Sequence, residues 1–290
     1  MMLCDPIRTF STPHYPTEAL VDIVGTGGDG HNTVNISTSA AILAAAAGAR
    51  VAKHGSVSVS SRSGSADVLS SLGIAMLPAA SIGPCIARCG MAFMFAPLFH
   101  PAMSQVAPVR RALKIRTVFN ILGPLLNPTG AQRLMLGVYA PALLDPYAQA
   151  LAALGVKHAL VVHCCGLDEL APIGVAEARE IDSTGSISTL EVDTSEWVPQ
   201  CSIADLEGGE PSENADIIRS VFAGGEAAAG AVGHTIALNA GAALYVAGVD
   251  SSIRAGYEHA FRVLSEGGAA LQLKKWAETS QGLHSPGDQQ

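Results

Sequence analysis

Charged, aromatic and cysteine residues are all scarce in this 290-residue chain. Charged side chains make up 14% of the sequence, against about 25% in ordinary globular proteins, while apolar residues make up 49%. This balance argues against long disordered tracts and for one large domain or two modest ones. Aromatic residues reach only 5%, whereas there are 30 glycines, which favours helices packed closely on a sheet over a β-sandwich.

Three further shortages narrow the class of protein. Lys and Arg number 17 against 25 Asp and Glu, so the net charge is −8. This charge disfavours a broad nucleic-acid-binding face, because such a face needs many cations. Six scattered cysteines are too few for a disulfide framework, which favours a reducing, cytoplasmic compartment. The longest apolar stretches, around 40–49 and 236–249, fall short of a membrane span, and the first residues do not resemble a secretory signal. We expect no nucleic-acid and no membrane partner.

A strand, a glycine- or serine-rich loop and a helix follow one another twice near the N-terminus. The first unit is a strand at Val21–Val24, the loop GTGGDG at 25–30 and a helix through Ala40–Ala47 that Asn35 and its neighbours are expected to cap. The second unit is a strand at Arg50–Ala52, the loop at 53–67 and a further helix. This alternation predicts an α/β fold with a parallel sheet.

The remaining pattern continues the α/β reading. Strands are expected at 91–95, 134–139 and 159–162, an antiparallel section at 176–192, and helices at 68–72, 84–89, 101–113, 141–154, from 214, at 236–249 and at 253–264. The tail after Gly282 is expected to be frayed.

The loop GTGGDG satisfies the pattern G-x-G-x-x-G between a strand and a helix. A dinucleotide site would also need an acidic residue about 20 positions later, and none occurs between Asp29 and Asp67. Consecutive glycines still let backbone N–H groups approach a phosphate at a helix N-terminus. The loop therefore predicts a phosphate site, with a ligand-free glycine turn as the alternative.

Two other expected strand ends carry groups suited to the same ligand. Lys53 offers a cation beside a run of serine hydroxyls, and Asp168 and Glu169 form an acidic pair after the strand at 159–162. In open α/β sheets ligands bind at the carboxyl ends of the strands. Two carboxylates would repel a polyphosphate unless a divalent cation lay between them, so the sequence predicts a diphosphate bridged by Mg²⁺.

Ordered motifs over residues 21–271 extend this reading. The chain carries, in this order, the segments DIVGTGGDG, NIST, KHG, SGSADVL, HPAM, VRRALKIRTVFNILGPLLNP, GLDEL and ALNAGAALYVAG. It thereby resembles anthranilate phosphoribosyltransferase. The resemblance implies a nucleoside-phosphorylase-like, parallel-rich α/β sheet flanked by helices, with a small, here truncated, α-helical domain. It also implies transfer of the phosphoribosyl group of phosphoribosyl pyrophosphate (PRPP) to anthranilate in tryptophan biosynthesis, with two Mg²⁺ ions and a homodimer.

The resemblance assigns site residues one by one. The PRPP-binding residues it implies are Gly25, Thr26, Gly27, Gly28, Asp29, Thr33, Asn35, Ser37, Thr38, Lys53 and Ser65. Those implied for anthranilate are Gly25, His54, Ser56, Arg110 and Pro124, with Arg110 facing the carboxylate, and those implied for Mg²⁺ are Ser37, Asp168 and Glu169. No covalent nucleophile is expected.

The chain departs from the family pattern in two places. The family has Asn followed by a basic residue where this chain has Ser56 and Val57, which bears on the acceptor or the rate. The family also has further helices before its glycine loop, whereas 24 residues precede Gly25 here, which is expected to weaken or alter the dimer. The expected division is an arm at 1–20, a first α/β part at 21–95, a helical segment and hinge at 96–124, and a second α/β part at 125–290.

Alternative readings remain open at this stage. One is a related phosphoribosyltransferase or pyrimidine-phosphorylase-like enzyme with another acceptor, and another is a catalytically silent homologue. Cys85 and Cys89, or His163 to Cys165, could be imagined as metal ligands, but their spacing favours ordinary buried residues. His100 is expected to be structural or to line the pocket.

Overall fold

The computed structural model describes residues 19–58, 62–101 and 121–284. The helix expected at 101–113, including Arg110, and most of the expected N-terminal arm therefore lie outside the described residues. None of the helices in the described ranges combines the length and the apolar character that crossing a bilayer requires.

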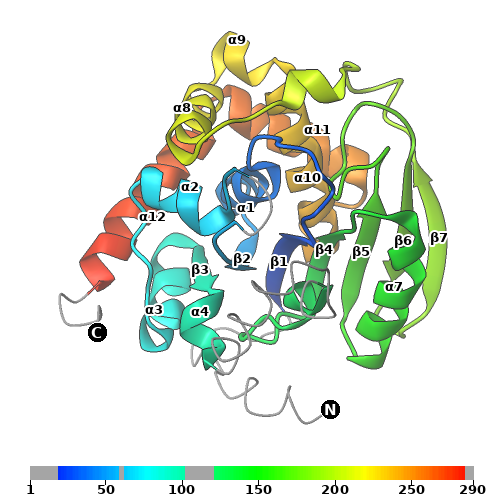
Figure 1. The fold of residues 1–290 in the computed structure, drawn as a ribbon, viewed down its shortest axis with the longest axis horizontal. Helices are drawn as coiled ribbons and strands as arrows, with labels where there is room; N and C mark the ends of the chain where they lie inside the picture. The colour runs from blue at the N-terminus through cyan, green and yellow to red at the C-terminus, as the bar shows by residue number, and fades with distance from the viewer. Residues whose placement is uncertain (1–18, 59–61, 102–120, 285–290) are drawn as a thin grey trace.

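A seven-stranded sheet organises the chain, with the strand order β3-β2-β1-β4-β5-β6-β7 (Figure 1). The strands are β1 (Leu20–Gly25), β2 (Arg50–Gly55), β3 (Met91–Phe95), β4 (Arg133–Gly137), β5 (His158–His163), β6 (Ala176–Ile181) and β7 (Ile187–Val192). The first five in spatial order pair in parallel, while β6 and β7 add an antiparallel edge. The expected parallel-rich α/β sheet is confirmed.

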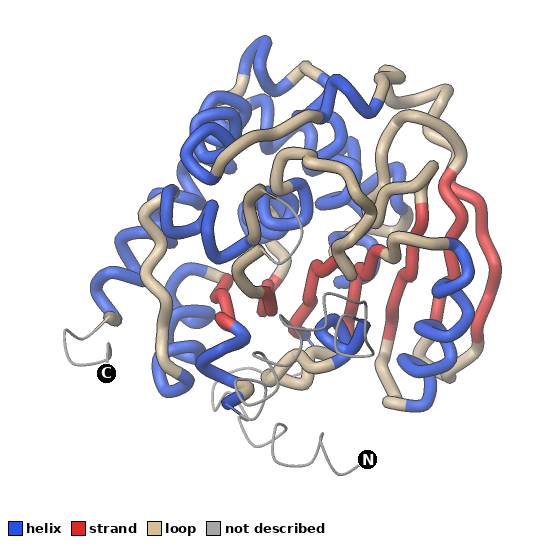
Figure 2. The backbone as a smooth tube through the Cα atoms, viewed as in Figure 1, coloured by secondary structure: helices blue, strands red, loops and turns tan. Residues whose placement is uncertain are grey.

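Helices cover both faces of this sheet (Figure 2). They are α1 (Ile36–Ala46), α2 (Ser65–Ser71), α3 (Ala79–Cys89), α4 (Ala96–Phe99), α7 (Leu144–Ala153), α8 (Pro211–Phe222), α9 (Gly225–Ala228), α10 (Ala231–Ala247), α11 (Ile253–Ser265) and α12 (Gly268–Leu283), with short 3₁₀ turns at Gly123–Leu125, Pro141–Leu143 and Ile203–Leu206. The parallel strands are largely apolar because both of their faces are covered.

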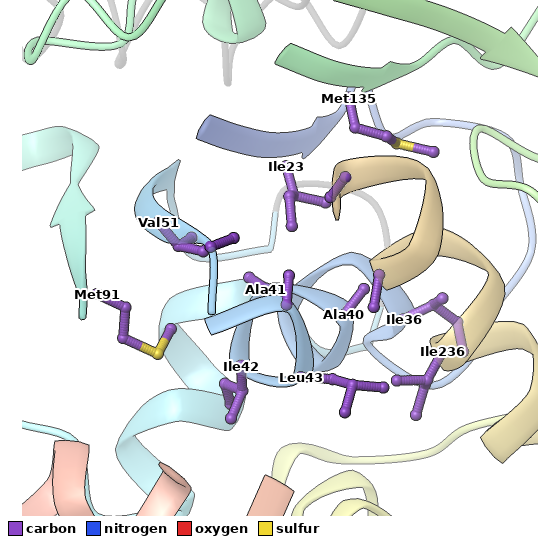
Figure 3. Packing of buried hydrophobic residues seen from close by; sticks show 14 of the residues in the cluster. Ile23, Ile36, Ala40, Ala41, Ile42, Leu43, Val51, Met91, Met135 and Ile236 are labelled. Atoms are coloured by element: carbon purple, nitrogen blue, oxygen red, sulfur yellow. The ribbon is translucent and has the colours of Figure 1, made fainter. Parts of the chain in front are cut away.

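Two hydrophobic clusters lie on opposite faces of the sheet. Successive side chains of β4 alternate between them, since Met135 joins the larger cluster and Leu134 and Leu136 join the smaller. The larger cluster packs α1 and α10 on the sheet, and Figure 3 shows α1 residues such as Ala41 beside Ile23. The smaller cluster is formed with α7. This arrangement holds β1 and α1, which flank the glycine loop, on a rigid base.

Two expectations about helices are wrong. The chain continues into a helix, α12, where no helix was expected after 264. Adjacent glycines at 267 and 268 look like a break, but tertiary packing buries Trp276 to 1% exposure and stabilises the helix. Asn35 does precede α1, yet its side chain makes no capping hydrogen bond. Its amide bonds Ser63 instead, so a tertiary contact replaces the local one.

Candidate functional site

The glycine loop and the acidic pair meet at the carboxyl ends of the parallel strands. Gly25 ends β1 and pairs in register with Gly137 at the end of β4, while Gly137 pairs with Val162 of β5. The loops that follow β1 and β5 therefore emerge at the same end of the sheet, on either side of β4 (Figure 1). The site therefore lies at the carboxyl ends of the strands, where open α/β sheets bind their ligands.

The glycine loop takes a shape that only glycine adopts easily. Gly27, Gly28 and Gly30 have φ angles of 64°, 79° and 85°, in the left-handed region. The Thr26 N–H donates to the Gly137 carbonyl at 3.0 Å, and the Thr26 hydroxyl accepts from the Tyr139 N–H at 3.1 Å. A Cβ built on Gly27 meets nothing within 4 Å, so this side of the loop is open.

The segment after the loop is tied to the C-terminal part of the chain. Thr33 forms an isolated bridge with Glu207, and the Val34 N–H donates to the Leu206 carbonyl at 3.0 Å. Asn35 accepts hydrogen bonds from Ser63 and from Asn214 of α8, both at 3.0 Å. Ser37 and Thr38 then lie in the first turn of α1. These contacts place Thr33, Asn35, Ser37 and Thr38 around the helix N-terminus.

The acidic pair reaches across to the glycine loop and α1. An Asp168 oxygen accepts from the Gly27 N–H at 2.6 Å, and a Glu169 oxygen accepts from the Ser37 N–H at 3.0 Å. The structure therefore joins the predicted metal residues Ser37, Asp168 and Glu169 to the predicted phosphate loop. The sequence predicted that the loop and the acidic pair lie at the same ends of the strands, and the structure adds the individual hydrogen bonds, one of them between residues 141 positions apart.

Three carboxylates, those of Asp29, Asp168 and Glu169, interact at this end of the sheet. Burial, and next the Asp29 carboxylate, raise the pKa of Asp168 to about 6. Burial, and next Asp168, raise the pKa of Glu169 well above its usual value, with the Ser37 N–H opposing the shift. Desolvated, mutually repelling carboxylates are stabilised by a cation, so this donor set fits Mg²⁺, a hard ion that binds oxygen.

The same edge lacks a complete cage of protein ligands. Across the described ranges, no cluster of three or more His, Cys, Asp or Glu side chains is arranged to hold a metal ion. Mg²⁺ commonly binds through one or two carboxylates plus substrate phosphates, so the acidic pair suits an ion that arrives with a diphosphate. Cys85 and Cys89, considered above as metal ligands, are both buried in the core cluster.

Two facing glycines make room for Asp168, and the sequence reading missed one of them. A Cβ on Gly137 would lie 1.5 Å from the Asp168 backbone oxygen, and a Cβ on Gly25 would lie 2.4 Å from its carboxylate oxygen Oδ2. Any larger residue at 137 would displace the acidic pair. The available signal was a glycine directly at the end of a strand, which often marks a close approach of backbone.

Lys53 lies beneath the site. Its side chain is 2% exposed, and its Nζ donates to the Ile23 carbonyl at 2.5 Å. Burial lowers the pKa of Lys53, while Asp22, Glu169 and Asp168 oppose that shift. The Lys53 charge therefore acts on the acidic pair from below, a role that sequence reasoning did not assign.

Asp22 was also missed as a site residue. It is fully buried, and its oxygens accept from the His54 N–H at 3.1 Å and from Asn127 Nδ2 at 2.8 Å. Burial raises the pKa of Asp22 to about 6, with Lys53 opposing the shift. An aspartate inside the apolar strand VDIV was the available signal, because a buried acid needs partners.

Two of the segments expected at the acceptor side meet, those of His54 and Pro124. His54 Nδ1 lies 3.2 Å from the Gly123 carbonyl, next to Pro124, and His54 Nε2 lies 3.0 Å from His100 Nε2. Burial, and next His100, lower the pKa of His54 to about 3, so its ring is neutral. The Gly123 carbonyl then requires a proton on Nδ1, and His54 Nε2 accepts from His100.

Ser56, directly after β2, contacts Ser65, the first residue of α2. The Ser65 hydroxyl donates to the Ser56 carbonyl at 3.1 Å, and the Ala66 N–H donates to the same oxygen. This contact holds Ser56 at the start of α2. Arg110, expected to face the acceptor carboxylate, lies outside the described residues.

Comparison with known proteins agrees with this geometry. Residues 17–270 match the family described as "Glycosyl transferase family, a/b domain". An anthranilate phosphoribosyltransferase from Shewanella sp. (strain MR-7) is 45% identical over 95% of this chain and 81% of the relative. The anthranilate phosphoribosyltransferase structure from Thermus thermophilus is similar with a TM-score of 0.83 at 43% identity, covering 91% of this chain and 78% of that one.

A second solved structure adds ligands to the comparison. The anthranilate phosphoribosyltransferase from Saccharomyces cerevisiae in complex with PRPP and Mg is similar with a TM-score of 0.86 at 30% identity, covering 97% of this chain and 79% of that one. Sequence identity at this level over most of both chains, together with the same fold, establishes the family. This chain belongs to the anthranilate phosphoribosyltransferase family.

Proposed function

We propose that this chain transfers the phosphoribosyl group of PRPP to anthranilate, giving N-(5-phosphoribosyl)anthranilate and pyrophosphate, as a step of tryptophan biosynthesis. The observation that carries the proposal is the acidic pair held against the glycine loop, with Asp168 bound to Gly27 and Glu169 bound to Ser37. The names of the relatives and the PRPP and Mg complex of the yeast structure support the same substrate and ion.

The diphosphate of PRPP is proposed to bind at the open side of the glycine loop. The loop from Gly25 to Asp29 leads to the N-terminus of α1 on this side, and the positive end of the helix dipole favours phosphate oxygens. Thr33, Asn35, Ser37, Thr38 and Ser65 complete this pocket, and Lys53 contributes its charge from beneath. Asp168 and Glu169 would hold Mg²⁺, which supplies charge neutralisation for the departing pyrophosphate.

The transfer needs no nucleophilic side chain. The anthranilate amine attacks C1 of the ribose, a C–N bond forms, the C–O bond to pyrophosphate breaks and the amine gives up a proton. The protein's part is to orient the two substrates and to stabilise the charge that develops on the leaving group. Neutral His54, with Ser56, Pro124 and Gly25, is proposed to line the acceptor site, and Arg110 to face its carboxylate.

Loss of anthranilate fluorescence on adding PRPP and Mg²⁺ tests the reaction directly. We expect turnover that stops with EDTA, and PRPP affinity, measured by calorimetry, that falls sharply with EDTA. Tight PRPP binding without metal would refute the Mg²⁺ assignment. Turnover of a nucleobase or another aromatic amine in preference to anthranilate would favour a related transferase with a different acceptor.

We also propose, from the family resemblance, that the chain works as a homodimer in the cytoplasm. Light scattering should then give twice the 29.7 kDa mass of one chain. A stable monomer at micromolar concentration would contradict the dimer, and recovery of the native protein outside the cytoplasm would contradict the location.

A further inference from the structure

A buried amide in helix α10 contacts the chain directly beside the acidic pair. Asn239, in the segment ALNAGAALYVAG, is 1% exposed among apolar neighbours. Its Nδ2 donates to the Leu170 carbonyl at 2.6 Å and to the Thr235 carbonyl at 2.8 Å, and its Oδ1 accepts from the Leu170 N–H at 3.0 Å. The side chain therefore pairs with both main-chain groups of Leu170, the residue after Glu169.

The other side of the acidic pair is held by a tight turn. Cys164 and Leu167 exchange backbone hydrogen bonds of 3.1 and 2.9 Å. Between them, Cys165 and Gly166 both have positive φ angles, 50° and 95°. Asp168 and Glu169 are thus the two residues that separate an anchor at Leu167 from an anchor at Leu170.

Such anchoring is needed because the pair is electrostatically unfavourable in the absence of a cation. Asp168 is 9% exposed and Glu169 follows it directly in the chain, so two carboxylates lie beside each other with little water to screen them. A loop free to move would relieve this repulsion by turning the carboxylates outward. A buried amide whose nitrogen donates twice and whose oxygen accepts from the loop opposes that movement.

We propose that Asn239 is a positioning residue for the metal site, acting through Leu170 to hold Asp168 and Glu169 where they bind Mg²⁺. The inference rests on the proposed function, since it concerns the ion that accompanies PRPP. The contacts of Asn239 described above go to main-chain groups and not to the acidic side chains. Its removal leaves the N–H and C=O of buried Leu170 unpaired, and the loop then moves to find other partners.

The expected effect is selective for the metal. Loss of a partner that orients metal ligands commonly lowers metal affinity by about 10- to 100-fold. For Asn239→Leu we expect the half-saturating Mg²⁺ concentration for PRPP binding to rise by about that factor. At saturating Mg²⁺ the PRPP affinity should recover, because the glycine loop is untouched. Mn²⁺ binding followed by electron paramagnetic resonance should weaken in parallel.

The chain offers a matched control in Gln272 of α12. Its Nε2 donates to the Cys89 carbonyl at 2.7 Å, and its side chain is 8% exposed. Cys89 precedes β3 and so lies near the amino ends of the parallel strands, whereas the site lies at their carboxyl ends. Gln272→Leu removes a buried amide of the same kind, and should lower the melting temperature without shifting the Mg²⁺ dependence.

Four proteins are compared: wild type, Asn239→Leu, Asn239→Ser and Gln272→Leu. The serine variant keeps the experiment informative if the leucine variant does not fold, because a small side chain leaves room for water at Leu170. Unchanged half-saturating Mg²⁺ and Mn²⁺ affinity in a folded Asn239 variant would overturn the inference while leaving the proposed function intact. Metal-independent PRPP binding by the wild type would overturn both.

Discussion

The glycine arm of the site, Gly25–Gly30, and its acidic arm, Asp168–Leu170, face each other but are shaped by different forces. Gly27, Gly28 and Gly30 have positive φ angles, so much of the glycine arm's shape is set by its own residues. The acidic arm takes its position from elsewhere, from room left at Gly25 and Gly137 and from Asn239, 69 positions after Leu170. The glycine arm can be recognised from its own residues, whereas the acidic pair could be recognised only from its place after a predicted strand, because acidic pairs also occur on ordinary protein surfaces.

The largest expected effect comes from filling the space beneath the acidic arm. Gly137→Ala puts a Cβ 1.5 Å from the Asp168 backbone oxygen, which must move. A displacement of about 1 Å in catalytic geometry can cost about 10²-fold in rate, so we expect at least that loss in kcat/KM. Circular dichroism checks that the fold survives.

Gly27→Ala is the matched change in the glycine arm. Its Cβ meets nothing within 4 Å, so the strain comes only from the φ angle of 64°, which alanine adopts less readily than glycine. A non-glycine residue there costs about 1–2 kcal/mol, and we expect a smaller loss of activity, seen mainly in the PRPP KM. Equal losses in the two glycine variants would remove the contrast between the arms.

Glu169→Gln separates function from stability in the acidic arm. The amide oxygen can still accept from Ser37, but a neutral amide replaces the partly buried carboxylate. We expect turnover to fall by about 10- to 100-fold as a metal ligand is weakened, while the metal-free protein melts at a higher temperature. A variant with normal activity at low Mg²⁺ would show that Glu169 plays no part in metal binding.

Ser56→Asn tests a region that belongs to neither arm. An amide reaches farther than a hydroxyl and offers both a donor and an acceptor to anthranilate. A neutral hydrogen bond contributes about 0.5–1.5 kcal/mol, so the anthranilate KM should fall by about 2- to 13-fold with PRPP affinity unchanged. If the variant uses anthranilate less well while the native chain prefers another aromatic amine, the native pocket is built for that acceptor.

Cys165→Asn should give the smallest effect. Cys165 has a φ angle of 50° in the turn that anchors the acidic arm, and asparagine tolerates this conformation better than most residues. We expect the free energy of unfolding to rise by up to about 1 kcal/mol with activity unchanged. A denaturant titration measures this, and a decrease in stability would mean that the Cys165 side chain contributes packing that outweighs the strain.

The strand, loop and helix pattern predicted the parallel sheet because its periodicity is a local property of the chain. The same reasoning missed α12, whose stability depends on burying Trp276 in the core rather than on a local signal. It also assigned Asn35 to a helix cap, whereas Ser63 and Asn214 provide its partners. Local rules failed where a distant segment offered a polar side chain a better hydrogen bond.

The sequence by itself determined the α/β alternation, the glycine arm and the family resemblance, which implies PRPP and anthranilate as the two substrates. Each depends on neighbouring residues, on periodicity or on the backbone freedom of glycine. Only the tertiary structure decided that Asp168 would meet Gly27, that Gly137 would have to be small and that Lys53 would lie under the site. Burial, charge repulsion and the pairing of main-chain groups arise when distant segments pack together, so no local pattern can reveal them.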